Sequence, residues 1–303
     1  MAEPATALVL ISAVNDEQER MRGLRLEWGS TASTEQVRQW LQWLLVDKAF
    51  GQEHPRMEFW VAAQAREVVD LPSLGSIRLH FEDLPPPAPA RLIKGATTGS
   101  TVLLKLLSQI TSDAETRDIE DTLKHTPDLS VQLLRLVNSV SFNLKEPVTS
   151  FAQAINILGR RQLQRWLQLL MFSGKAHAGD GRPLMARAAM RGALMEQLAL
   201  ARGQGREVCD MAFIVGMFSL LDVLFGKPIA DIVLPLKMGD EINQALLHRS
   251  GVLGRLLSLA DSAEHHDLQA VASSLADLQL DSATWSECQL TALQWMLSIG
   301  HDD

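Results

Sequence analysis

A run of prolines divides the chain into two segments with different hydrophobic patterns. Four of the five residues from Pro85 to Pro89 are proline. Proline lacks a backbone N–H and fixes its φ angle, so such a run cannot continue a helix or an interior strand and favours a stiff, extended spacer. We therefore predict a linker at residues 85–91, between a first domain at residues 1–84 and a second domain at residues 92–303.

The segment before the prolines combines short apolar runs with one amphipathic helix. Residues rich in β-branched and aromatic side chains, a composition that predicts strands, form four runs: 7–13, 23–28, 57–62 and 76–81. Ser33 and Gln36 have the spacing of a capping box and predict a helix that continues to about Phe50. The pattern indicates a small α/β domain.

The segment after the prolines has helical periodicity along its length. From Val102 to Leu297, apolar residues recur at the period of about 3.6 residues that is typical of amphipathic helices. Glycine and proline fall between the periodic stretches, where they are expected to end helices. We therefore predict an all-helical domain here, and a fold that is mainly α as a whole.

The composition is that of a globular protein. Apolar residues make up 47% of the 303 residues and charged residues 21%, and the chain is long enough to bury two cores. The net charge of −8 does not favour attraction to nucleic acid or to an anionic membrane. No apolar run approaches the roughly 20 residues that cross a bilayer, and Cys209 and Cys288 have no metal-binding spacing. We expect a cytoplasmic protein without a membrane span, disulfide framework or structural zinc site.

Three segments of the helical region carry a family resemblance. They are LLRLVNS at residues 133–139, INILG at 155–159 and MAFIVGMFSLLDVLFGKPIA at 211–230. Together they resemble the HDOD domain, a bacterial signalling module related to HD-type phosphohydrolases, and residues 247–260 are similar to the branch that is fused to EAL domains. The resemblance covers most of residues 92–259. It implies an all-helical fold and a regulatory, non-catalytic role through binding of another signalling protein.

The residues that would hold a metal ion in an HD-type hydrolase are replaced. Such a site needs histidine nitrogens and carboxylate oxygens that converge on a metal ion, which activates water. When Gly216 is aligned with the glycine of a GLLHDIG-like motif, Ser219 and Leu220 stand at the histidine and aspartate positions. Leucine cannot coordinate a cation, and a lone serine hydroxyl is a poor substitute. We also find no catalytic triad and no phosphate-binding loop, so we expect neither enzymatic activity nor a bound metal or cofactor.

The first domain is too short to be an EAL domain, which is a TIM barrel. A barrel of this kind normally uses roughly 250 residues, and no Glu-Ala-Leu string occurs in the chain. Residues 1–84 are therefore either a remnant of an EAL domain or an unrelated replacement.

Two polar features interrupt the apolar stripes of the helical region. Asn138 and Ser139 either present polar groups to a ligand or close the end of their helix, and turn chemistry favours the second alternative. Asp222 lies in an apolar stretch, where its charge needs compensation. We expect that compensation from Arg135, from Arg191 or from a backbone donor, in a structural role.

Two further sets of residues are candidates for contacts with a ligand or partner. Arg160, Arg161 and Arg165, beside Trp166, could bind phosphate and stack a base. The alternative function is therefore a receptor for a nucleotide second messenger such as a cyclic dinucleotide, or a degenerate HD-type phosphohydrolase; nucleic acid is disfavoured. Trp43 lies off the apolar stripe of the first predicted helix, so it is a candidate for a domain or partner contact.

Charge is unevenly distributed along the helical region. Between Gly159 and Gly192 seven basic residues accompany one acid, whereas no Lys or Arg follows Arg255. The two segments could complement one another inside the fold or across subunits of a homo-oligomer, but we favour two differently solvated faces. For His265 and His266, in the acidic segment, we predict a solvated polar turn rather than a metal site, because adjacent helical residues point about 100° apart.

Overall fold

The structure of the protein is a computed structural model. It describes residues 7–15, 21–29, 32–48, 50, 57–61, 78–81, 105–106, 108–110, 114–124, 153, 155–157, 159, 163–164, 167, 182–234 and 239–299. The predicted linker at 85–91 lies outside these residues, so the predicted domain boundaries stay a prediction. The chain divides into two compact units, of which the first comprises Met1–Ala90, Ala186–Ser219 and Gln244–Asp303, and the second Arg91–Met185 and Leu220–Asn243.

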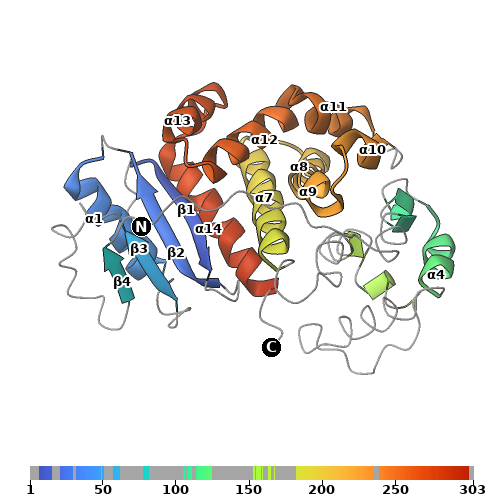
Figure 1. Ribbon diagram of the computed structural model, residues 1–303, viewed down its shortest axis with the longest axis horizontal. Coiled ribbons are helices and arrows are strands. Elements are labelled where there is room, and N and C mark those ends of the chain that lie inside the picture. The colour runs from blue at the N-terminus through green and yellow to red at the C-terminus, as the bar shows by residue number, and fades with distance from the viewer. Residues whose placement is uncertain are drawn as a thin grey trace. The chain divides into compact units, whose positions relative to one another are not determined.

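A small sheet near the N-terminus belongs to the first unit (Figure 1). Its strands are β1 (Val9–Asn15), β2 (Met21–Trp28), β3 (Glu58–Val61) and β4 (Arg78–Phe81), in that spatial order. β1 pairs with β2 in the antiparallel direction, whereas β2, β3 and β4 are parallel to one another. All four predicted strands are confirmed, and no bound differs from the prediction by more than two residues.

The predicted capping box starts helix α1 (Thr34–Gln42). Ser33 Oγ accepts a hydrogen bond from Gln36 N at 3.2 Å, and Gln36 Oε1 accepts one from Ser33 N at 2.8 Å. These reciprocal bonds satisfy two donors that a helix start leaves without intrahelical partners. The helix continues as the π-helical segment η1 (Trp43–Asp47), and Phe50 packs edge-on against Phe59 of β3, which joins this segment to the sheet.

The C-terminal helix α14 (Ser282–Ile299) is fastened to the sheet and to α1 inside the first unit. Trp285 Nε1 and Gln289 Nε2 both donate to the carbonyl of Val9 at 2.8 Å, and Ile11 N donates to Gln289 Oε1 at 3.0 Å. Trp40 Nε1 of α1 donates to Ser286 Oγ at 3.0 Å. The N-terminal and C-terminal segments therefore share one core.

The remaining described elements are helical, so the predicted fold class, mainly α with a small sheet near the N-terminus, is confirmed. They are α4 (Thr116–Lys124), α7 (Arg182–Ala201), α8 (Arg206–Phe218), α9 (Leu221–Phe225), α10 (Ile229–Val233), α11 (Asp240–His248), α12 (Gly251–Glu264) and α13 (Leu268–Asp277). Within the region of predicted helical periodicity, residues 211–225 belong to two helices, α8 and α9, which are separated at Ser219–Leu220. None of the described helices is both long and apolar enough to cross a membrane.

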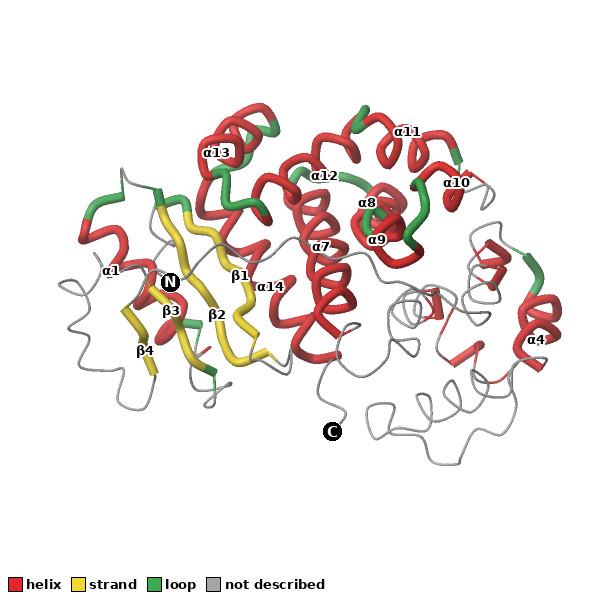
Figure 2. Tube along the Cα trace, in the orientation of Figure 1, coloured by secondary structure: helices red, strands yellow, loops and turns green. Residues whose placement is uncertain are grey.

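Short turns connect α11, α12, α13 and α14 (Figure 2). Each turn contains one non-glycine residue in the left-handed conformation: Arg249 (φ 53°), His266 (φ 58°) and Gln279 (φ 56°). This conformation costs a residue with a Cβ roughly 1–2 kcal/mol. Contacts elsewhere in the fold must therefore offset this cost. Two of these residues, Arg249 and His266, also make long-range polar contacts.

Candidate functional site

The candidate site is built where α7 and α8 come into close contact. A Cβ atom at Gly216 of α8 would lie 2.7 Å from Gly192 Cα and 2.8 Å from the carbonyl oxygen of Arg191, both on α7. No Cβ fits at such distances from backbone atoms, so a glycine at position 216 is needed for the two helices to approach this closely. The approach brings the side chain of Arg191 to Ser219, the residue that follows α8.

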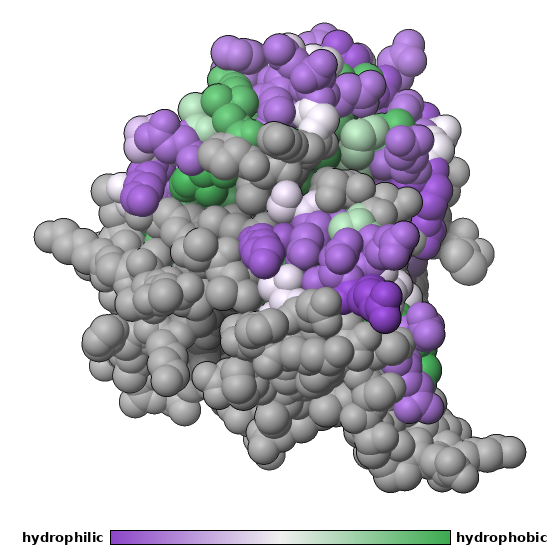
Figure 3. Space-filling model, turned by 90° about the vertical axis from the view of Figure 1, so that its right-hand side faces the viewer, coloured by the Kyte–Doolittle hydropathy of each residue, from purple (hydrophilic) through white to green (hydrophobic). Residues whose placement is uncertain are grey.

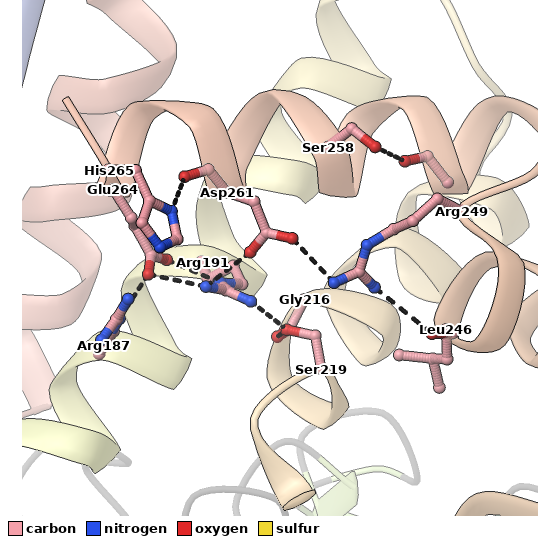
Figure 4. Close-up of polar contacts among 11 residues, drawn as sticks. Arg187, Arg191, Gly216, Ser219, Leu246, Arg249, Ser258, Asp261, Glu264 and His265 are labelled. Carbon is pink, nitrogen blue, oxygen red and sulfur yellow. Dashed lines mark hydrogen bonds and ion pairs between the residues drawn. The ribbon is translucent and has the colours of Figure 1, made fainter. Parts of the chain in front are cut away.

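Arg191 is the centre of a buried network of ion pairs (Figure 4). Its side chain is only 3% exposed. Nε and Nη2 donate to the two carboxylate oxygens of Glu264 at 2.6 and 2.7 Å, and Nη1 donates to Ser219 Oγ at 2.7 Å. Nη2 also forms an ion pair with Asp261 Oδ1 at 2.9 Å. One guanidinium therefore connects α7 with the end of α8 and with α12.

Two more arginines pair with the carboxylates of this network. Arg187, one turn before Arg191, pairs with Glu264 Oε2, and Arg249 Nη2 pairs with Asp261 Oδ2 at 2.8 Å. Each carboxylate thus lies between two guanidinium groups. We call these six residues the Arg191 network: Arg187, Arg191, Ser219, Arg249, Asp261 and Glu264.

The surroundings of Glu264 keep its carboxylate ionised. Burial by itself would raise the pKa of Glu264, but the charge and hydrogen bonds of Arg191, supported by those of Arg187, outweigh it and lower this pKa below the ordinary value. Bidentate guanidinium–carboxylate pairs of this kind are the strongest charge-assisted hydrogen bonds that side chains form. The Glu264 carboxylate is therefore charged at neutral pH.

The positions at which an HD-type hydrolase would hold its metal do not fit a metal ion here. Ser219 Oγ donates to the carbonyl of Gly216 at 2.7 Å and accepts from Arg191, so its hydrogen and a lone pair are already engaged. Leu220 is 5% exposed and has no donor atom. The guanidinium beside Ser219 would also repel a second cation. Among the described residues, no three His, Cys, Asp or Glu side chains are grouped so that they could hold a metal ion.

Two other predicted site residues have contacts of their own. Asp222 Oδ1 accepts a hydrogen bond from the backbone N–H of Val223 at 2.8 Å, which is the backbone donor that was one of the predicted alternatives. Trp43 is 4% exposed and packs against Trp40, with the ammonium group of Lys48 5.3 Å from its ring centre. Its burial leaves the ring little surface for an external partner, while Lys48 pairs with Glu287 of α14.

The other predicted site residues lie outside the described residues, so those predictions stay open. They are Asn138, Ser139, Arg160, Arg161 and Arg165.

Sequence reasoning did not identify the acidic partners of Arg191. We favoured two differently solvated faces for the basic and acidic segments, but Arg187 and Arg191 in fact meet Asp261 and Glu264 inside the fold. The signal was present in the spacing. Arg187 and Arg191 are four residues apart, and Asp261 and Glu264 are three apart, so each pair lies on one face of its helix.

The prediction of a solvated turn at His265–His266 is wrong for His266. The turn between α12 and α13 is there, but the His266 side chain is only 7% exposed and its Nδ1 lies 2.7 Å from Glu27 Oε2 of β2. Arg25 Nη2 contacts the same oxygen at 2.9 Å. A histidine at this turn therefore helps to fasten the C-terminal helices to the sheet.

Comparison with known proteins agrees with the resemblance seen in the sequence. The model of the HDOD domain family matches residues 98–225. The chain is 31% identical over 195 residues to Uncharacterized protein YuxH of Bacillus subtilis, which is 63% of this chain and 46% of the relative. It is 30% identical over 172 residues to Cyclic di-GMP phosphodiesterase CdgJ of Vibrio cholerae, which is 56% of this chain and 39% of the relative. No solved structure matches the chain.

The aligned part spans less than half the length of each of these relatives. Within this chain, Arg187, Arg191 and Ser219 lie inside the matched segment, whereas Asp261 and Glu264 follow it. The Arg191 network therefore connects the matched helices to a helix outside the match. An HDOD domain is thus found at residues 98–225 of the chain.

Proposed function

We propose that this chain is a non-catalytic, cytoplasmic signalling protein whose HDOD domain acts by binding another protein. The observation that carries the proposal is the state of Ser219. Its hydroxyl is engaged by Gly216 and Arg191, and a guanidinium lies beside the position at which a hydrolase would place a metal-binding histidine. Hydrolysis by an HD-type mechanism requires a metal ion at that position, so the domain is left with a binding role.

The described surface is suited to a transient contact. On the side of the molecule drawn in Figure 3, the described residues are mostly hydrophilic, with scattered hydrophobic residues between them. The large hydrophobic side chains that are exposed among the described residues are Ile157, Leu200 and Leu234. Regulated, short-lived complexes use interfaces that are no more apolar than the rest of the surface. The described residues on this side are consistent with such an interface.

The proposal that the chain is not an enzyme can be tested with purified full-length protein. We expect no turnover of a panel of nucleotides, cyclic di-GMP included, in the presence of Mg²⁺ or Mn²⁺. Metal-dependent hydrolysis that a substitution in the helical region abolishes would overturn the proposal. The binding half requires a partner that forms a stoichiometric complex when both proteins are purified, with no turnover in the complex.

A second candidate function is a receptor for a nucleotide second messenger. It is favoured by the relative that is named a cyclic di-GMP phosphodiesterase, although the alignment covers 39% of that protein. Calorimetry with cyclic di-GMP should compare the wild-type chain with Arg160→Ala and Arg161→Ala. Micromolar binding that these substitutions remove supports the receptor; binding that they leave unchanged, or no binding at all, counts against this role for the arginine cluster.

A further inference from the structure

We infer that the Arg191 network is a cation-binding site whose cation is supplied by the chain itself, and that the site would bind a guanidinium-type cation from solution if the Arg191 side chain were removed. The inference goes beyond the proposed function, because it concerns what fills this part of the domain and holds whichever partner the protein binds. It rests on the contacts within the Arg191 network.

The site is formed by oxygen atoms from two parts of the fold. Glu264 and Asp261 of α12 supply carboxylate oxygens, and Ser219 supplies a hydroxyl oxygen from the end of α8. Their contacts with the guanidinium nitrogens range from 2.6 to 2.9 Å. The group they surround is 3% exposed. A cation at this place is therefore both desolvated and compensated.

The arrangement of these oxygens selects the class of cation. Three different nitrogens of one planar group are engaged, two of them by the same carboxylate, as in a bidentate fork. A divalent metal ion needs its oxygens around one point at about 2.0–2.6 Å. Oxygens that are distributed over three nitrogens of a guanidinium are too widely spread for that. The geometry points to a flat cation with several N–H donors.

The charge of the site also disfavours a divalent ion more than a monovalent one. Asp261 and Glu264 carry two negative charges, and Arg249 and Arg187 remain paired with them when Arg191 is absent. A guanidinium would restore the charge of the intact site, whereas a divalent ion would exceed it and be repelled by both outer arginines. The site thus differs in charge as well as in shape from a metal centre.

The resident cation has a structural consequence for the domain. Because Arg191 belongs to α7, its contacts connect three helices through a group that cannot dissociate. A metal ion in the same role would make the helix arrangement depend on metal concentration. We therefore expect the unfolding midpoint of the wild-type protein to be indifferent to chelators.

Chemical rescue tests the inference. In full-length Arg191→Ala, the thermal unfolding midpoint should rise with guanidinium chloride at low millimolar concentrations, far below those that denature proteins, and the rise should saturate as a binding equilibrium requires. Sodium chloride at the same concentrations is the control for ionic strength. The wild-type midpoint should not rise, because Arg191 already occupies the site.

Two matched variants make the rescue specific. Arg191→Met fills the space with an unbranched apolar side chain, and Arg191→Ala with Glu264→Gln removes the charge that would hold the ligand. We expect no rise in the midpoint of either. If Arg191→Ala folds and responds equally to guanidinium and sodium, or if Arg191→Met responds as strongly, the inference is overturned.

A further variant decides the case in which Arg191→Ala does not fold in either salt. Arg191→Lys keeps the positive charge on a side chain of similar length. A cation site requires its unfolding midpoint to lie clearly above that of Arg191→Met, though below the wild type because the fork is lost. Equal midpoints for the lysine and methionine variants would contradict the inference.

Discussion

Two arginine–carboxylate pairs in this protein have the same chemistry but differ in how far they are buried. Glu35 and Arg38 lie three residues apart near the start of α1, with side chains 56% and 38% exposed. Glu264 and Arg191 lie between helices, with side chains 21% and 3% exposed. The pKa of Glu35 is lowered to about 2, chiefly by its hydrogen bond to Arg38. The pKa of Glu264 is lowered as well, although burial opposes the shift.

The comparison teaches that a lowered pKa does not rank ion pairs by their effect on stability. Solvent screens an exposed pair, and both of its members are nearly as well hydrated when the pair is broken. A buried pair has no such alternative, since the partner that remains is left desolvated. We therefore expect the Arg191 network to govern stability and the Glu35–Arg38 pair to contribute almost nothing.

The largest effect is expected from Arg191→Met. Removal of one partner of a buried ion pair typically lowers the free energy of unfolding by about 3–5 kcal/mol. We expect about 3 kcal/mol, because Arg187 and Arg249 still neutralise Glu264 and Asp261. Urea denaturation of the full-length protein measures the change. Arg38→Met is the matched control, and equal losses in the two variants would contradict the comparison.

A smaller loss is expected from Gly216→Ser, which tests the helix contact that positions Arg191. Its Cβ would meet backbone atoms of Gly192 and Arg191 at 2.7–2.8 Å, so α7 and α8 must separate. Overpacking of this kind costs about 1–3 kcal/mol. Gly205→Ser is the control, because no atom lies within 4 Å of a Cβ there and serine suits the N-cap of α8. Similar losses at both positions would show that close approach at Gly216 is unimportant.

Local signals in the sequence predicted the elements that surround the site. The capping box at Ser33–Gln36 and the helical period of residues 184–201 depend only on neighbours along the chain, and both are confirmed in α1 and α7. The replacement of the hydrolase motif at Ser219–Leu220 could also be read directly.

The long-range contacts of the site could not be predicted in the same way. Glu264 is separated from Arg191 by 73 residues, and His266 from Glu27 by 239. Which acid meets which base depends on how the helices pack, and the spacing of charges within a helix shows only which side chains share a face. The position of His266 is harder still to predict, because its backbone is left-handed although the residue is neither glycine nor asparagine, the residues that usually signal this conformation.

Acid should weaken the contribution of Glu264 to the stability of the folded protein. Since its pKa is lower in the folded protein than the ordinary value of 4.5, the unfolded chain binds more protons in acid. The stability that Glu264 contributes is therefore complete above that value and is lost as the pH falls through the folded-state pKa. Urea midpoints of the wild type and Glu264→Gln should differ at neutral pH and converge in acid. A constant difference would contradict this assignment.

The smallest effect is expected from Glu35→Gln, although the pKa of Glu35 is the one lowered to about 2. The helix start should survive because Ser33 and Gln36 cap it independently of this charge. We expect an unfolding midpoint that cannot be distinguished from the wild type. Salt sharpens the contrast, because at about 1 M ionic strength charges are screened over about 3 Å. In NMR titrations the pKa of Glu35 should then rise toward its ordinary value, whereas the pKa of Glu264, shielded from ions by burial, should stay low. Salt therefore distinguishes an exposed pair, which ions screen, from a buried pair, which they do not.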